Sequence, residues 1–281
     1  MEKRVEIIKR SSIYLFLIGF GVIMIYPLIW LFFASMKTNA ELFNSIQLFP
    51  ETFDWTPYRS GWQGSGQYTF GTFFINTFKL VIPTVLFTIV SSVLVAYGFA
   101  RFNFPGRKIL FSLMISTLML PNAVLIIPRY IIFRNLGWLD SYKPFTMPAL
   151  FACGPFFIFM LVQFFRGLPK ELEEAATIDG CNSFTTLTRI LLPLCKPALF
   201  SVGIFQFVWT WNDFFNTLIY VNSVSKYTVS LGLRMAIDIS AAVNWNQVIA
   251  MSVLTMLPCI IIFFLSQKHF VEGIATSGLK G

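Results

Sequence analysis

The sequence carries little charge: only 12% of its 281 residues are Asp, Glu, Lys or Arg, whereas about 25% is usual for a soluble globular protein. Hydrophobic residues make up 56% of the chain, and 33 residues are Phe. A single soluble core of this length cannot bury so much apolar surface, so the excess must face lipid. The composition excludes an ordinary soluble domain and predicts an integral membrane protein.

Residues that build metal and redox sites are scarce as well. The single histidine, His269, lies near the C-terminus, and we interpret it as a solvated residue rather than a ligand or base. The four cysteines, at 153, 181, 195 and 259, lack the paired spacing of metal knuckles and disulfide frameworks. The sequence also lacks the Gly-x4-Gly-Lys-Ser/Thr loop that cradles phosphates. We therefore expect no catalytic residue, no metal and no cofactor in this chain.

Long apolar runs predict six transmembrane helices and an all-α fold. Crossing about 30 Å of hydrocarbon takes roughly 20 residues of helix. Runs of that length cover 13–35, 80–100, 109–128, 144–165, 197–221 and 248–267, and only the fifth contains a charge, Asp213. The first run is too long for a signal-peptide core, so we expect a retained helix. Prolines at 83, 121, 128, 148 and 155 predict kinks, either hinges or static bends.

The distribution of Lys and Arg predicts the orientation. If the N-terminus is cytoplasmic, thirteen of these residues fall on inside segments and eight on the longer outside segments. The positive-inside bias then places both termini in the cytoplasm. The predicted organisation is a cytoplasmic N-terminus (1–12), a first helix (13–35), an extracytoplasmic loop (36–72), a core (73–267) and a cytoplasmic tail (268–281).

The cytoplasmic segment 167–195 is too structured for a simple connector. Pro169 suits the first position of a helix, and Gly180 suits the left-handed residue that ends one. Asn182 or Ser183 can cap a second helix, which must stop near Pro193. Local rules therefore predict a hairpin of two short helices, the first covering 169–179.

Two interpretations of this hairpin follow from its pattern alone. Ala175 and Ala176 leave a small surface that a partner can approach closely, and Glu174 beside them offers a charge for an Arg of that partner. Alternatively, the segment is an amphipathic loop that lies on the membrane. The pattern by itself favours neither.

The spacing of residues in this segment resembles the signature loop of ABC importer permeases. The matching residues are Glu174, Ala175, Ala176, Gly180, Ile190, Leu192 and Pro193. More specifically, the chain resembles the MalG-like branch, which serves carbohydrates. Supporting stretches are Pro27-Leu28-Ile29-Trp30 with Ser35 and Lys37, Tyr97-Gly98-Phe99-Ala100-Arg101, Leu168-Pro169-Lys170-Glu171-Leu172-Glu173-Glu174, Trp211-Asn212-Asp213-Phe214, Phe270-Val271-Glu272-Gly273 and Gly278-Leu279-Lys280-Gly281.

The resemblance implies one subunit of a larger transporter in the cytoplasmic (inner) membrane, with the type I importer permease fold. Implied partners are a second homologous permease, a dimer of ATP-binding cassette ATPases that binds ATP and Mg²⁺, and an extracytoplasmic solute-binding protein. The signature residues would couple this chain to the ATPase, and the transported solute would be a sugar or oligosaccharide. Nucleic acid is not an expected partner.

The polar residues of the fifth apolar run are candidates for the substrate path. A charge in mid-membrane costs about 2.5–3.5 kcal/mol on insertion scales, so we expect Asp213 to face protein or a water-filled cavity. Amides, a carboxylate and aromatic faces suit sugar hydroxyls and rings. The candidates are Gln206, Trp209, Trp211, Asn212, Asp213 and Asn216. Alternatively, Asn212 and Asp213 only lock this helix to its neighbours.

Other classes of membrane protein fit the sequence less well. A secondary transporter needs intramembrane charges for coupling ions and usually an internal repeat, but this chain has one such Asp and no evident repeat. A membrane enzyme needs a nucleophile with a base, or a metal cluster. A permease for another small solute, such as an amino acid or phosphate, shares the signature loop and remains an alternative.

Overall fold

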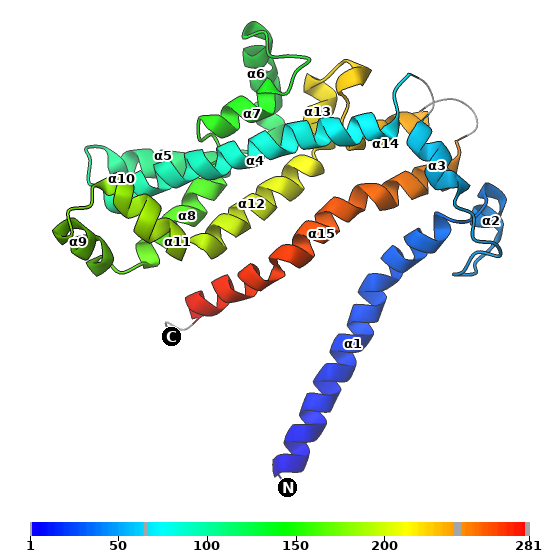
Figure 1. Cartoon of the computed structure of the whole chain (residues 1–281), viewed down its shortest axis with the longest axis horizontal. Helices are drawn as coiled ribbons and strands as arrows, with labels where there is room; N and C mark the ends of the chain where they lie inside the picture. Colours follow the sequence, from blue (N-terminus) through cyan, green and yellow to red (C-terminus); the bar gives the residue numbers. More distant parts are fainter. Residues whose placement is uncertain (1, 65–66, 239–242, 279–281) are drawn as a thin grey trace. The chain divides into compact units, whose positions relative to one another are not determined.

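The computed structural model describes residues 2–64, 67–238 and 243–278, the side chains of 2–5, 7–8 and 268–278 excepted. The end of the predicted tail, 279–281, lies outside the described residues. Every regular element within the described ranges is a helix (Figure 1), which confirms the predicted all-α class.

The first half of the chain contains two long helices and several short ones. They are α1 (Glu2–Ala34), α2 (Asn39–Asn44), α3 (Thr56–Gln63), α4 (Phe70–Arg101), α5 (Arg107–Leu118), α6 (Asn122–Asn135) and α7 (Lys143–Leu150). The second half contains α8 (Pro155–Gly167), α9 (Glu171–Ile178), α10 (Ser183–Thr185), the π-helix η1 (Thr186–Leu191), α11 (Leu192–Leu194), α12 (Lys196–Trp211), α13 (Phe214–Tyr220), the 3-10 helix η2 (Val224–Lys226), α14 (Val229–Asp238) and α15 (Trp245–Gly278).

Within the described residues, four helical segments are long and apolar enough to cross a membrane: Lys9–Ala34, Phe70–Arg101, Lys143–Gly167 and Trp245–Gln267. Two further spans exist if the bent helix pairs within 107–135 and 183–211 each count as one, so the maximum number agrees with the six predicted. The second pair differs from the predicted span 197–221, because it begins within the predicted hairpin. The second predicted span is ten residues longer at its start, since α4 already begins at Phe70.

Three of the predicted spans are not continuous helices. α5 and α6 meet at 105° across 119–121, residues 151–154 separate α7 from α8, and 212–213 separate α12 from α13. Proline explains the first two breaks, because Pro121 and Pro155 drive the residues before them away from helical geometry. At the other three prolines the helix is not interrupted, since Pro83, Pro128 and Pro148 lie inside helices.

The chain forms two compact units. The first comprises residues 1–71 and 233–257. There the chain after α1 is fastened by polar contacts: the buried Lys37 donates to the carbonyl of Gln47, and the Ser35 and Tyr58 hydroxyl oxygens lie 2.7 Å apart. These contacts indicate a structural role for Ser35 and Lys37.

The second unit comprises residues 72–232 and 258–281. Its core joins α4, α8, the second helix of the hairpin and α12, which lie side by side in Figure 1. α12 approaches α4 closely at Gly203, where an added Cβ would lie 3.4 Å from Ile89 Cδ1. Fully buried members of this core include Ala96, Leu161, Phe165, Leu191 and Val202. The hairpin is therefore built into the packing of the membrane helices.

Candidate functional site: a helical hairpin and three broken spans

Segment 167–195 folds as the predicted hairpin, with small shifts in its limits. The first helix, α9, begins two residues after Pro169 and ends at Ile178, so the prediction that Pro169 opens it was wrong. Gly180 has φ 82°, in the left-handed region, as predicted. The Asn182 side chain caps the second helix by accepting a hydrogen bond from Thr185 N at 2.8 Å. That helix ends at Leu194, beside Pro193, and bends by 80° into α12.

One face of α9 is exposed. Glu174 and Ala175 are exposed, and Ile178, three residues further, is 87% exposed. Residues three and four apart share a helix face, so these side chains form one surface. Phe184, 68% exposed, adds a large apolar side chain at the start of the second helix. Ile178 and Phe184 were missed in the sequence analysis, although two large apolar residues in a polar segment were the available signal.

Ala176 does not contribute to this surface. It is only 2% exposed, and its carbonyl accepts the N–H of Cys181 at 2.9 Å. The expectation that both alanines offer a small surface is therefore wrong for Ala176, whose small side chain instead lies inside the hairpin.

The second helix of the hairpin is held by residues other than the signature ones. Leu187 and Leu191 are buried in the core of the second unit. Ile190 and Leu192 are half-buried, and Pro193 is exposed. Residues 186–191 form a π-helix, which has more residues per turn than an α-helix. The residues that face the core therefore differ from those that an α-helical period of 3.6 predicts.

Residues near the end of α4 contact both helices of the hairpin. Arg101 Nε lies 2.5 Å from Glu173 Oε1, and the Arg101 side chain is only 5% exposed. A second guanidinium nitrogen of Arg101 donates to the carbonyl of Leu168 at 3.0 Å. The Tyr97 hydroxyl lies 3.3 Å from the carbonyl of Ser183. The hairpin is thus attached directly to α4 through both of its helices.

The six candidate path residues do not form one surface. Trp211 is 1% exposed and packs against Phe78 and Phe207, so it is a core residue. Trp209 is half exposed and lies against Phe156 and Phe157. Two amides make local contacts on α12: Gln206 donates to the Thr210 hydroxyl at 2.6 Å, and Asn212 donates to the carbonyl of Val208 at 2.9 Å.

Asp213 and Asn216 do come together, at the break between α12 and α13. The Asp213 carboxylate caps α13 by accepting from the N–H of Asn216 at 3.0 Å, and the Asn216 amide donates to both of its oxygens. Both residues line a cavity of about 210 Å³ with Arg129 and Tyr220, and its remaining walls are Phe133, Pro144, Phe145, Pro148 and Cys153. Side chains from all three broken spans therefore line this cavity, and they include a cation, a carboxylate, an amide and a phenol.

The break between α7 and α8 contains an unusual backbone conformation. Ala152 has φ 57°, which costs a non-glycine residue about 1–2 kcal/mol. Irregular backbone at membrane depth is tolerated only where protein buries it or where it lines a water-filled cavity. Ala152 packs half-buried against the core of the second unit, which fits the first condition, and the next residue, Cys153, lines the cavity.

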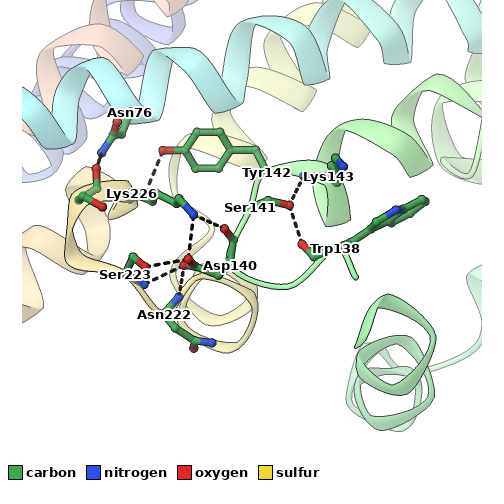
Figure 2. Close-up of polar contacts among 10 residues, drawn as sticks. Asn76, Trp138, Asp140, Ser141, Tyr142, Lys143, Asn222, Ser223 and Lys226 are labelled. Carbon is green, nitrogen blue, oxygen red and sulfur yellow. Dashed lines mark hydrogen bonds and ion pairs between the residues drawn. The ribbon is translucent and has the colours of Figure 1, made fainter. Parts of the chain in front are cut away.

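A polar cluster ties together the two loops that follow α6 and α13 (Figure 2). The Asp140 carboxylate accepts from the backbone N–H of Asn222 and Ser223, from the Ser223 hydroxyl and from Lys226 Nζ, at 2.7–3.1 Å. The Tyr142 hydroxyl donates to the carbonyl of Lys226 at 3.0 Å. The ends of two broken spans, after α6 and after α13, are thereby joined.

The electrostatics of this cluster follow from the same contacts. The hydrogen bond from Lys226 is the main reason that the pKa of Asp140 lies far below its usual range. Burial, with a smaller contribution from the charge of Asp140, raises the pKa of Tyr142 to about 12. Asp140 therefore stays ionised and Tyr142 stays protonated at physiological pH, so the junction is intact across that range.

Comparisons with known proteins agree with this architecture. Residues 88–276 match the family described as "Binding-protein-dependent transport system inner membrane component". The arabinooligosaccharides transport system permease protein AraQ of Bacillus subtilis is 31% identical, over 98% of this chain and 97% of AraQ. The sn-glycerol-3-phosphate transport system permease protein UgpE of Yersinia pestis is 34% identical, over 92% of this chain and 93% of UgpE.

A solved structure, a bacterial ABC transporter involved in the import of the acidic polysaccharide alginate, contains a chain with the same fold. The TM-score is 0.83 and the identity 23%, over 95% of this chain and 98% of that one. The match of the family to two thirds of the chain, and the full-length similarity to two transport permeases, show what kind of protein this is. The chain belongs to the family of binding-protein-dependent transport system inner membrane components, the permease subunits of ABC importers.

Proposed function

We propose that this permease imports a sugar or oligosaccharide, and that its hairpin 167–195 is the docking site for a separate ATPase. The observation that carries the proposal is the exposed face of Glu174, Ala175 and Ile178 on a hairpin anchored in the core of the membrane helices. An apolar surface beside an acidic group suits a cleft that contains an Arg.

Coupling then follows from rigidity. The ATPase binds and hydrolyses ATP with Mg²⁺, and closure of its dimer moves the hairpin. Leu187 and Leu191 carry that motion into the core, and Arg101 carries it to α4. Because closely packed cores transmit strain rather than absorb it, the membrane helices shift with the hairpin.

The solute path is proposed to run past the three broken spans. Discontinuous helices at membrane depth are a common setting for substrate sites in transporters. The cavity at Asp213 and Asn216 is smaller than the roughly 300–1,000 Å³ of typical ligand pockets. It therefore accommodates at most part of an oligosaccharide, and the second permease subunit supplies the remainder of the path.

The remaining partners follow from the family. A second permease completes the membrane domain, and a solute-binding protein delivers the sugar to the outer loops joined by Asp140. AraQ, a permease for arabinooligosaccharides, favours a sugar. UgpE, a permease for sn-glycerol-3-phosphate, supports the second candidate, another small polar solute.

The substrate can be identified through the binding protein. The chain is co-expressed with candidate ATPase, permease and binding-protein subunits from the same genome, and the binding protein is titrated with sugars and with glycerol phosphates. We expect tight binding of a sugar or oligosaccharide and uptake of the same compound by the reconstituted complex. Binding of a non-carbohydrate alone would replace the sugar proposal with the second candidate.

The proposed orientation, with both termini cytoplasmic, predicts the outcome of cysteine labelling. Single cysteines introduced at positions 5 and 277 should react with a membrane-impermeant maleimide only after the cells are opened. A cysteine at position 60 should react in intact cells. The background is a variant in which the four native cysteines are replaced by serine and which still transports. Labelling of position 5 in intact cells would contradict the positive-inside assignment.

Two variants of Asp213 distinguish a role in the solute path from a purely structural role. Asn caps helices about as well as Asp, so Asp213→Asn keeps the cap of α13 and removes the charge from the cavity, together with one of the two hydrogen bonds from the Asn216 amide. We expect this variant to assemble normally and to lose at least about tenfold in transport rate, whereas Asp213→Ala should also destabilise α13 by about 1 kcal/mol. Normal transport by Asp213→Asn, with poor assembly of Asp213→Ala, would instead assign Asp213 to structure alone.

A further inference from the structure

A second cavity in this chain gathers positive charge and lies apart from the proposed solute path. It has a volume of about 820 Å³ and is formed by the turn between α4 and α5, the first turns of α5 and the last residue but one of α8. Arg107, Lys108 and Arg166 line it, and no acidic side chain does so among the described residues. The cavity therefore carries three uncompensated cations.

Two of these cations are held in place by neighbours that leave their charge unneutralised. Arg107 donates to the side-chain oxygen of Asn103 at 2.7 Å and more weakly to the carbonyl of Ala100 at 3.4 Å. The guanidinium carbon of Arg166 lies 5.0 Å from the centre of the Phe111 ring. Across the described ranges, no ion pair involves any of the three cations. A guanidinium has five donors, so most remain available to a ligand.

The walls of the cavity favour a lipid over a free anion. Phe104, Ile109 and Phe111 contribute apolar surface to it. The apolar surface continues along α5, where Ile109 is 68% exposed, Leu110 50% and Leu113 58%. A free phosphate gains nothing from such a surface, whereas the acyl chains of a phospholipid can cover it.

We propose that this basic cavity, defined by Arg107, Lys108 and Arg166, binds the headgroup of an anionic phospholipid of the inner leaflet, with the acyl chains along α5. The cavity lies on the cytoplasmic side in the orientation proposed above. The cytoplasmic leaflet carries anionic lipids, and basic pockets between membrane helices are suited to their headgroups. The same core that holds the hairpin contains Phe165, next to Arg166, so an occupied cavity would stabilise the base of the hairpin.

Native mass spectrometry of the full-length chain, purified with its co-expressed transporter subunits, tests this binding. The probes are phosphatidylglycerol and phosphatidylcholine of matched acyl chains, added in equal amounts in mild detergent. Each basic residue near a membrane surface contributes roughly fivefold to the preference for anionic lipid. The triple variant Arg107→Gln, Lys108→Gln, Arg166→Gln should therefore lower the retention of phosphatidylglycerol by about 100-fold.

A matched control removes the same number of charges outside the cavity, at the exposed Lys9, Lys170 and Lys196. This variant should retain phosphatidylglycerol as the unmodified protein does. The variant Arg107→Lys, Arg166→Lys keeps the charge and should also retain it, which guards against misfolding as the cause of a loss.

Three results would overturn the proposal. Equal loss in the triple variant and its control would mean non-specific attraction by surface charge. Equal retention of both lipids by the unmodified protein would mean no headgroup site. Displacement of bound phosphatidylglycerol by millimolar inorganic phosphate or glycerol phosphate would mean a site for a free anion.

Discussion

Ala175→Trp is expected to abolish transport by preventing the ATPase from docking. Ala175 lies on the exposed face of α9 beside Glu174 and Ile178. A Trp there should not disturb the hairpin, because Ala175 is exposed, but it fills the space that a closely fitting partner needs. Packing at interface cores is as dense as in protein interiors, so the clash cannot be relieved by small movements. Co-purification of the tagged chain with its ATPase should fall below detection, and uptake of the solute with it.

Thr177→Trp is the matched control. Thr177 is also exposed on α9, and two residues along a helix correspond to a rotation of about 200° from Ala175. Because Thr177 lies three residues from Glu174, at the edge of the docking face, this variant should impair binding and transport much less than Ala175→Trp does. If Ala175→Trp binds and transports normally, the hairpin is only a connector at the membrane surface, and the proposed mechanism of coupling is wrong.

Arg101→Ala is expected to uncouple the hairpin from the membrane helices. The Glu173 side chain is 22% exposed and its carboxylate pairs with Arg101, so removal of Arg101 leaves a largely buried charge without a partner. Loss of one partner of a buried ion pair costs about 3 kcal/mol. This cost lowers the ratio of hairpins packed against α4 to hairpins released from it on the order of 100-fold. ATP hydrolysis by the assembled complex should continue, but the loaded binding protein should no longer stimulate it, and transport should fall at least tenfold.

The double variant Arg101→Ala, Glu173→Ala provides the control for this pair. Replacing both partners removes the unpaired charge, so the double variant should be less impaired than Arg101→Ala alone. Limited proteolysis at the hairpin gives an independent readout, with faster cleavage in the single variant than in the double one. If the single variant shows unchanged stimulation and unchanged cleavage, Arg101 does not position the hairpin.

Features that depend on neighbouring residues along the chain could be predicted from the sequence. The apolar runs predict the membrane spans because their length must match the bilayer. Gly180 in the left-handed region and Asn182 as a cap were predicted because each requirement is met within a few residues. The hairpin and the membrane class therefore follow from the sequence by itself.

The break at 212–213 differs from the other two in how it could be foreseen. Pro121 and Pro155 mark their breaks in the sequence, although the size of the bends does not follow from proline alone. At Asp213 no proline is present, and the helix ends because the Asp213 carboxylate caps a new one. The sequence is equally compatible with a continuous helix in which Asp213 is buried against a neighbour. Only the folded structure distinguishes that helix from the broken one.

Only the tertiary structure decided which side chains face outward and which long-range pairs form. Ala175 and Ala176 are equivalent in sequence, yet one is exposed and the other buried. Trp211, a candidate for the path, lies in the core. Arg101 pairs with Glu173, although two predicted spans separate them along the chain. The physical reason is that local sequence sets where a helix begins and ends, whereas its rotation about its own axis is set by packing against helices distant in the chain.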